Sequence, residues 1–129
     1  MKTKSDPRHK VRVQTVKNLF EKNFRSRAGT KSELVKNIIA RQNEIDKLLV
    51  KNAPAWPIDQ IAPLDLAVLR LAVFELLFKK RKEPYKVVID EAVEIAKEYS
   101  GKSSASFVNG VLGSIVKSKF KDQISKIVT

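Results

Sequence analysis

The stretch LDLAVLRLAVFELLF, residues 64–78, is the longest apolar run of the chain. A helix of this composition is apolar on nearly every side, which is typical of an element buried at the centre of a domain. Asp65, Arg70 and Glu75 interrupt the run, so it lacks the roughly 20 uninterrupted apolar residues that a membrane span requires. Because unpaired buried charges are costly, we expect Arg70 and Glu75 to form satisfied polar links in the core.

The segments around this run show helical periodicity, and none shows the alternation typical of strands. We expect helices at about 8–24, 32–51, 64–78, 85–99 and from Ser103 or Ser104 to about 121. Prolines break the chain at 54 and 57, and Gly101 ends the fourth helix. The sequence therefore predicts an all-α, single-domain helical bundle of five to six or more helices over residues 8–129, after a flexible basic tail over residues 1–7.

Composition narrows the class of protein. The 129 residues are 43% hydrophobic and include no cysteine, which fits one domain with a modest core in a reducing compartment. The first residues, MKTKSDPRHK, lack the apolar centre of a signal peptide. We therefore expect a cytoplasmic protein without a membrane segment.

The net charge of +12 is concentrated at the two ends of the chain. Residues 1–31 hold ten Lys/Arg and two acids, residues 32–101 hold eleven of each, and residues 102–129 hold five Lys and one Asp. Such segregation indicates a surface for a polyanion, and nucleic acid above others. A solubilising tail and a membrane-surface role are the alternatives.

No pattern of catalytic or cofactor-binding residues stands out, so we expect a protein that is not an enzyme and has no cofactor. His9, the single histidine, lies in the basic segment, where we expect it to be solvated or to face phosphate. Four acids lie within two turns of one helix: Asp90, Glu91, Glu94 and Glu98. We interpret them as a charged face for a partner's salt bridges rather than a metal or acid–base site.

The stretch SSASFVNGVLGSI, residues 103–115, carries two glycines inside a helical pattern, each costing about 1 kcal/mol relative to alanine. At about 100° per residue, one side of this helix gathers the residues that face the core, Val108, Val111, Leu112 and Ile115. Gly110 then lies outside that stripe beside Phe107, and Gly113 lies further round. The glycines leave a bare strip next to an aromatic ring.

This strip lies near the start of a helix, where unpaired backbone amides favour an anion. Ser103 or Ser104 would cap the helix, and Lys102 adds a cation. A phosphate suits the amides, and an unstacked base suits Phe107. Close packing of another helix against Gly110, with Phe107 as ordinary core, is the other interpretation.

Three blocks resemble, in order and spacing, the family of the bacterial transcription antitermination factor NusB. They are LDLAVLRLAVFELL at 64–77, EPYKVVIDEAVEIAK at 83–97 and FVNGVL at 107–112. The similarity is strong over about 54–116, and RHKVR at 8–12 resembles the arginine-rich start of the family. The resemblance implies an all-helical protein that binds boxA-like single-stranded RNA in ribosomal RNA leader transcripts. Members act together with the ribosomal protein NusE in the elongating RNA polymerase complex.

The resemblance and the charge pattern together give two sets of candidate residues. The candidate RNA-binding residues are Arg8, His9, Lys10, Arg12, Lys102, Ser103, Ser104, Phe107 and Gly110. The candidate partner-binding residues are Phe20, Asp65 and Arg70. Cations would contact the RNA backbone, a ring would contact a base, and an acid would contact a basic partner.

Some positions depart from the family pattern. Ser103 stands where members often have an acid, and Ser106 where a lysine is common. The region between Phe24 and Ile45 is short by most of a helix, which bears on the homodimerisation that some members show. Two other functions stay open, a stand-alone NusB-like domain assisting a ribosomal RNA cytosine methyltransferase and a helical dimerisation module with non-specific RNA binding.

Overall fold

The computed structural model describes residues 6–24 and 32–128, with side chains described over 6–21 and 32–121. Within this part the chain forms α1 (Pro7–Phe24), α2 (Glu33–Ala40), α3 (Gln42–Asn52), the short 3₁₀ helix η1 (Ile58–Gln60), α4 (Pro63–Leu77), α5 (Tyr85–Ser100) and α6 (Lys102–Val128). The predicted all-α class is confirmed. No helix in the described part combines the length and apolar character that a membrane crossing requires.

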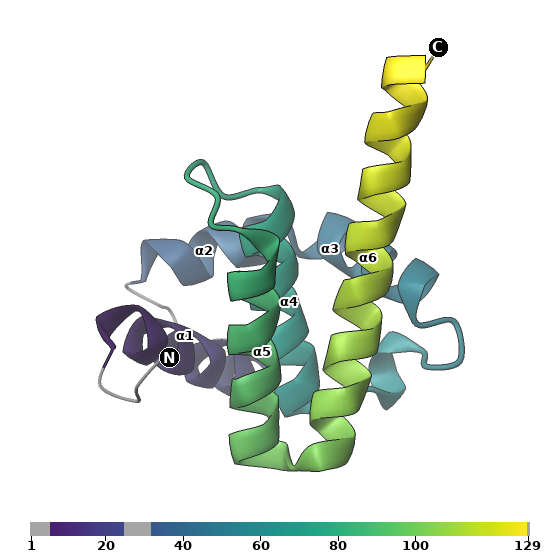
Figure 1. Ribbon diagram of the computed structural model, residues 1–129. Helices are drawn as coiled ribbons and strands as arrows, with labels where there is room; N and C mark the ends of the chain where they lie inside the picture. Colours follow the sequence, from purple (N-terminus) through teal and green to yellow (C-terminus); the bar gives the residue numbers. More distant parts are fainter. Residues whose placement is uncertain (1–5, 25–31, 129) are drawn as a thin grey trace.

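Helix α4 is the centre of the bundle (Figure 1). Every residue from Asp65 to Glu75 is buried, and the helix contacts α1, α3, α5 and α6. Pro63 occupies the first turn, where its missing N–H has no helical partner to lose. The sequence therefore predicted both the helix and its central position correctly, because a run that is apolar all round can only be buried.

The single helix expected over residues 32–51 is wrong, because the chain bends at Arg41. Its backbone leaves the helical region (φ −100°, ψ 5°) and separates α2 from α3. The Arg41 guanidinium lies 5.0 Å from the centre of the Phe78 ring and pairs with the adjacent Glu44. The bend lets both short helices contact α4 with the buried residues Val35, Ile38, Ile45 and Leu49.

The expected cap of α6 is also wrong. The helix begins at Lys102, directly after Gly101, so Ser103 and Ser104 lie inside its first turn. Gly101 has φ +103°, in the left-handed region that favours glycine, and it lets α5 turn at once into α6. Helix α6 also runs past its expected C-terminal end, and its second half projects beyond the other helices in Figure 1.

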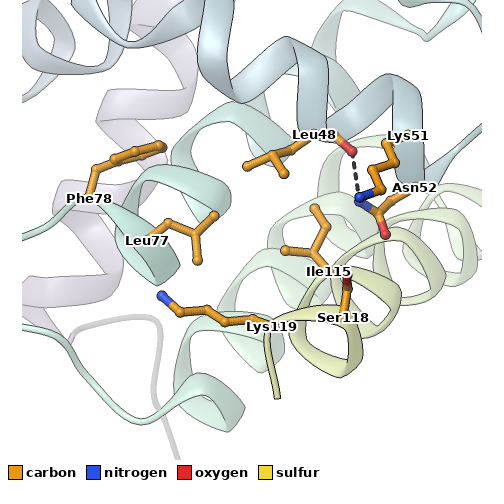
Figure 2. Close-up of a pocket in the computed structure, with 8 residues that line it drawn as sticks. All are labelled: Leu48, Lys51, Asn52, Leu77, Phe78, Ile115, Ser118 and Lys119. Carbon is orange, nitrogen blue, oxygen red and sulfur yellow. Dashed lines mark hydrogen bonds between the residues drawn. The ribbon is translucent and has the colours of Figure 1, made fainter. Parts of the chain in front are cut away.

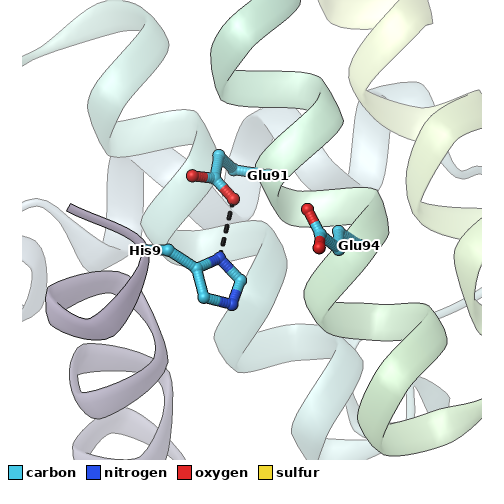
Figure 3. Close-up of side chains that lie close together, drawn as sticks. All are labelled: His9, Glu91 and Glu94. Carbon is cyan, nitrogen blue, oxygen red and sulfur yellow. Dashed lines mark hydrogen bonds and ion pairs between the residues drawn. The ribbon is translucent and has the colours of Figure 1, made fainter. Parts of the chain in front are cut away.

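A buried network of charges attaches α1 to the rest of the bundle. Arg12 is 5% exposed, and its Nε and Nη2 donate to Glu75 at 2.9 and 2.8 Å. Its Nη1 lies 3.2 Å from Glu91 Oε1, and its Nη2 lies 3.0 Å from Glu83 Oε1. His9 Nδ1 lies 2.8 Å from the other Glu91 oxygen, Oε2 (Figure 3). The network joins α1 to α4, to α5 and to the loop between them.

Two of the candidate RNA-binding residues therefore lie inside the protein. The expectation that His9 is solvated is wrong, because it is 4% exposed. Arg12 is not free to contact phosphates, because all its nitrogens are engaged by carboxylates. The physical reason is helical spacing. His9 and Arg12 are three residues apart and share one face of α1, and that face lies against α4 and α5. Arg8 and Lys10 remain exposed.

Three charged residues of the central and following helices, Arg70, Glu75 and Glu91, are also paired within the chain. Arg70 donates from Nε and Nη2 to Asp46 at 3.0 and 2.9 Å, and Glu75 accepts from Arg12. This confirms the satisfied polar links expected of Arg70 and Glu75. Glu91 is 2% exposed, so the expected partner-facing role of the α5 acids is wrong for that residue.

Removing the Arg12 guanidinium should destabilise the folded protein. We expect Arg12→Ala to lower the free energy of unfolding by about 3–5 kcal/mol, because it leaves buried carboxylates without their counter-charge. Urea denaturation followed by circular dichroism measures the change. Arg8→Ala, on the exposed side of the same helix, serves as control and should stay within about 0.5 kcal/mol. Equal stability of the two variants would contradict the role of the network.

Candidate nucleic-acid interface

A hollow of about 290 Å³ lies where the N-terminal ends of α4 and α6 meet. Figure 1 shows α5 joined to α6 at the lower end of the view, where α4 also begins. The hollow is lined by Trp56, Gln60, Ile61, Ala62, Asp65, Ser103, Ser104 and Phe107. The starts of two helices therefore border this hollow. Backbone N–H groups at a helix start carry partial positive charge, which favours an anion there.

Two aromatic rings form one wall. Trp56 is 49% exposed, and its ring centre lies 6.0 Å from that of Phe107, with the planes at 70°. Phe107 is half-buried and packs against the core with its other edge. Trp56 was not among the residues predicted from the sequence, although an aromatic residue between two prolines in a loop was a usable signal. The pair offers an open ring face of the kind on which bases stack.

Asp65 supplies the hollow with an unusual acceptor. Its Oδ2 accepts a hydrogen bond from Ser104 Oγ at 3.0 Å, whereas its buried Oδ1 has no partner among the described residues. Burial raises the pKa of Asp65, and hydrogen bonds from Ser104 and Ser100 lower it by less. An unpaired buried acceptor is costly in the free protein.

The two helical glycines leave open surface. A Cβ placed on Gly110 or Gly113 would meet no described atom within 4 Å. The interpretation that another helix packs against Gly110 is therefore wrong. The bare strip lies on the surface of α6, next to Phe107, as the sequence indicated.

The structure brings some of the candidate residues together and separates others. Asp65, Ser103, Ser104 and Phe107 share the hollow, and Lys102 is exposed at the start of the same helix. Arg70 is 6% exposed and bound to Asp46, so its expected place in a partner-binding surface is wrong. Of the other two candidate partner-binding residues, Phe20 is half-buried on α1. Asp65 is buried but lines the hollow.

The exposed cations of α1 lie along the end of α5. Lys10 and Tyr99 line a second hollow, of about 310 Å³, together with Gln14. Lys17 Nζ lies 5.8 Å from the centre of the Tyr99 ring, which is 45% exposed. Tyr99 precedes Lys102 by three residues, so cations and aromatic rings continue from α1 to the start of α6. Lys17 and Tyr99 were not predicted from the sequence, because neither belongs to a recognisable motif.

A third hollow lies elsewhere and contains none of the candidate residues. Figure 2 shows its lining, which comes from α3, the end of α4 and α6: Leu48, Lys51, Asn52, Leu77, Phe78, Ile115, Ser118 and Lys119. The Asn52 amide is satisfied there, since it donates to the Leu48 carbonyl and accepts from Ser114. This hollow of about 350 Å³ is not part of the candidate interface.

The comparison with protein families matches residues 3–117 to the NusB family. The chain belongs to the NusB family. The transcription antitermination protein NusB of Chloroflexus aggregans is 36% identical over 84% of this chain and 86% of its own length. That of Clostridium novyi is 34% identical over 85% of this chain and 98% of its own length. The NusB of Acetivibrio thermocellus is 45% identical over 67% of this chain, a match that spans 59% of that relative.

Solved NusB structures share the fold. T. maritima NusB superposes with a TM-score of 0.77 at 34% identity, covering 91% of this chain and 93% of the other. A complex of the antitermination factors NusB and NusE with double-stranded RNA contains a chain that superposes with a TM-score of 0.75. That chain is 26% identical, and the match covers 86% of this chain and 96% of the other.

Asp65 carries a prediction about stability. We expect Asp65→Asn to raise the free energy of unfolding at neutral pH, because it removes a buried charge while its amide oxygen can still accept from Ser104. Burial raises the folded pKa, so the charged form destabilises the protein above that pKa. The difference should vanish below the ordinary value of 3.8. Denaturation at neutral pH and near pH 3 measures it, with exposed Asp59→Asn as control. A less stable variant at neutral pH would contradict this account.

Proposed function

We propose that this chain is a transcription antitermination factor that binds boxA-type RNA in ribosomal RNA leader transcripts together with NusE. In this role it promotes processive elongation by RNA polymerase and works as an adaptor without catalysis. The observation that carries the proposal is membership of the NusB family over residues 3–117. The shared fold with a NusB chain in a NusB–NusE–RNA complex supports the same conclusion.

The hollow between α4 and α6 is the proposed site for an RNA base. A splayed base can stack on the exposed ring of Trp56 or against Phe107, since each ring lies at the mouth of the hollow. An exocyclic amine or ring N–H of that base can donate to the carboxylate of Asp65, which lines the hollow. The same carboxylate could instead accept from NusE, as the resemblance implies. The Lys102 ammonium and the amides of Ser103 and Ser104 then face the adjoining phosphate.

The exposed cations of α1 are the proposed contacts to the RNA backbone. Arg8, Lys10 and Lys17 are exposed, and backbone contacts by such side chains bind all sequences alike. Arg12 and His9 take no part, because their side chains are buried. Base recognition at the α6 end and phosphate contact along α1 would together give affinity and sequence preference.

The partners of this surface are part of the same proposal. Phe20 is half-buried on α1 and would present its outer edge to NusE. The RNA polymerase elongation complex would be reached through the assembled RNA and NusE. A homodimer is the alternative assembly, and sedimentation of the free chain measures it.

RNA-binding anisotropy tests the function. A boxA-like RNA and a scrambled RNA of equal length are titrated with the chain, with and without NusE, at two salt concentrations. We expect preference for the boxA-like RNA and a further gain in affinity with NusE. Equal, salt-sensitive binding of both RNAs under every condition would reject the proposed function.

Phe107 should contribute to recognition of the base. We expect Phe107→Ala to weaken binding of the boxA-like RNA by about 1–3 kcal/mol, the usual value of one base stack. Tyr85→Ala is the matched control, because this ring is 51% exposed at the opposite end of α5. Anisotropy measures both variants, and circular dichroism checks their folding. An unchanged RNA affinity in folded Phe107→Ala would mean that this ring contributes only to the packing of the core.

Lys10 should act on the backbone only. We expect Lys10→Ala to weaken boxA-like and scrambled RNA by equal factors and to reduce the salt dependence by about 0.7 of a unit, the value of one phosphate contact on a single strand. Lys36→Ala, an exposed lysine on α2, is the control. A change in sequence preference without a change in salt dependence would contradict a phosphate contact.

A further inference from the structure

We propose that His9, Glu91 and Glu94 form a binding site for one transition-metal dication, of which Zn²⁺ is the reference case. The three side chains meet between α1 and α5 (Figure 3). One ligand atom from each lies within 4.8 Å of the other two. His9 and Glu91 are buried, and Glu94 is half-buried. The proposal rests on this donor set and does not depend on RNA binding.

The donors select the class of metal. An imidazole nitrogen with two carboxylate oxygens suits borderline dications such as Zn²⁺ and Co²⁺. Mg²⁺ and Ca²⁺ prefer sites made of oxygen alone. Glu91 and Glu94 are three residues apart on α5, so they present their carboxylates on one face of the helix. Helix α1 brings His9 to that face.

Outer hydrogen bonds hold the donors in place. Arg12 Nη1 lies 3.2 Å from Glu91 Oε1, which directs the other oxygen, Oε2, toward His9 Nδ1 at 2.8 Å. Arg12 is itself fixed by Glu75 and Glu83. Support of a ligating carboxylate by a second layer of hydrogen bonds is a common property of protein metal sites. The presence of a buried histidine in this supported geometry separates the cluster from a patch of surface acids.

The local charge balance favours an added cation. Glu94 makes no hydrogen bond or ion pair with any residue that the structure describes, although it is half-buried. The network beside it contains three more carboxylates but two permanent cations, Arg12 and Lys79, which lies 3.8 Å from Glu75. Partly buried carboxylates without counter-charge are unfavourable. A dication shared by His9, Glu91 and Glu94 would supply positive charge there, and it would replace the proton of the hydrogen bond between His9 Nδ1 and Glu91 Oε2, which is released to solvent.

A hollow of about 310 Å³ between α1 and α5 borders this cluster on the His9 side. It is lined by His9 itself and by residues around it, Lys10, Val13, Gln14, Glu98 and Tyr99. We expect a metal ion to approach the site from this side. Ligand number, supporting contacts and access are the features that a metal site must combine.

The composition of the chain makes the test direct. The 129-residue chain without an affinity tag has one histidine and no cysteine, so imidazole NMR signals report on His9 alone. We expect Zn²⁺ to shift these signals saturably at one equivalent, and Mg²⁺ to leave them unchanged. Zn²⁺ should also raise the melting temperature, because a ligand that binds the folded state stabilises it by mass action. His9 signals that stay unchanged up to millimolar Zn²⁺ would overturn the proposal.

Two variants separate the site from general binding to acids. Glu94→Gln should weaken Zn²⁺ binding roughly tenfold or more and reduce the Zn²⁺-dependent rise in melting temperature accordingly. It should fold normally, since Glu94 contributes no described ion pair. Asp90→Asn removes an exposed acid from the same helix and should bind Zn²⁺ like the parent chain. If calorimetry gives Glu94→Gln and the parent chain the same affinity for Zn²⁺, the three residues do not form a metal site. His9 and Glu91 are then part of the ion-pair network alone.

Discussion

The buried guanidinium of Arg12 is the constraint on which the placement of α1 depends. A buried carboxylate without a counter-charge costs several kcal/mol, and Arg12 serves glutamates from α4, from α5 and from the loop between them. Burial alone lowers the pKa of Arg12, but its contacts with Glu75 and Glu83 outweigh burial and raise it. The charge is therefore permanent. Helix α1 must dock where this one group can meet all three carboxylates.

The hollow between α4 and α6 has the opposite character, because its groups are poorly satisfied in the free protein. Trp56 keeps 49% of its surface exposed, and Asp65 Oδ1 lacks a partner among the described residues. Both features oppose stability, since an apolar ring gains by burial and a buried acceptor gains by pairing. A well-packed core elsewhere, centred on α4, supplies the stability that allows such a site. This contrast distinguishes a binding surface from a structural cluster more clearly than residue type does.

Periodicity predicted most of the fold, and it failed where a single residue decided the local geometry. The apolar run at residues 64–78 specified α4, because no other arrangement buries it. The bend at Arg41 was not predictable, since neither proline nor glycine marks it and the Phe78 ring near its guanidinium lies far away in the sequence. At the site, Phe107 and the open strip at Gly110 were predictable from helical spacing. The burial of His9 and Arg12 was not, because their partners lie 63 to 82 residues away in the sequence.

The segment RHKVR at residues 8–12 explains why basic composition alone misassigns function. Its charges look equivalent in the sequence, but the helix divides them between two environments within one turn. His9 and Arg12 face carboxylates, and the Arg12 charge stabilises the fold there, while Arg8 and Lys10 face solvent, where their charges are available to a polyanion. A charge neutralised inside the protein contributes little to the field that an RNA phosphate experiences. The nucleic-acid affinity of such a helix therefore depends on the number of cations on its outer face. The total number of arginines in the helix overestimates that number.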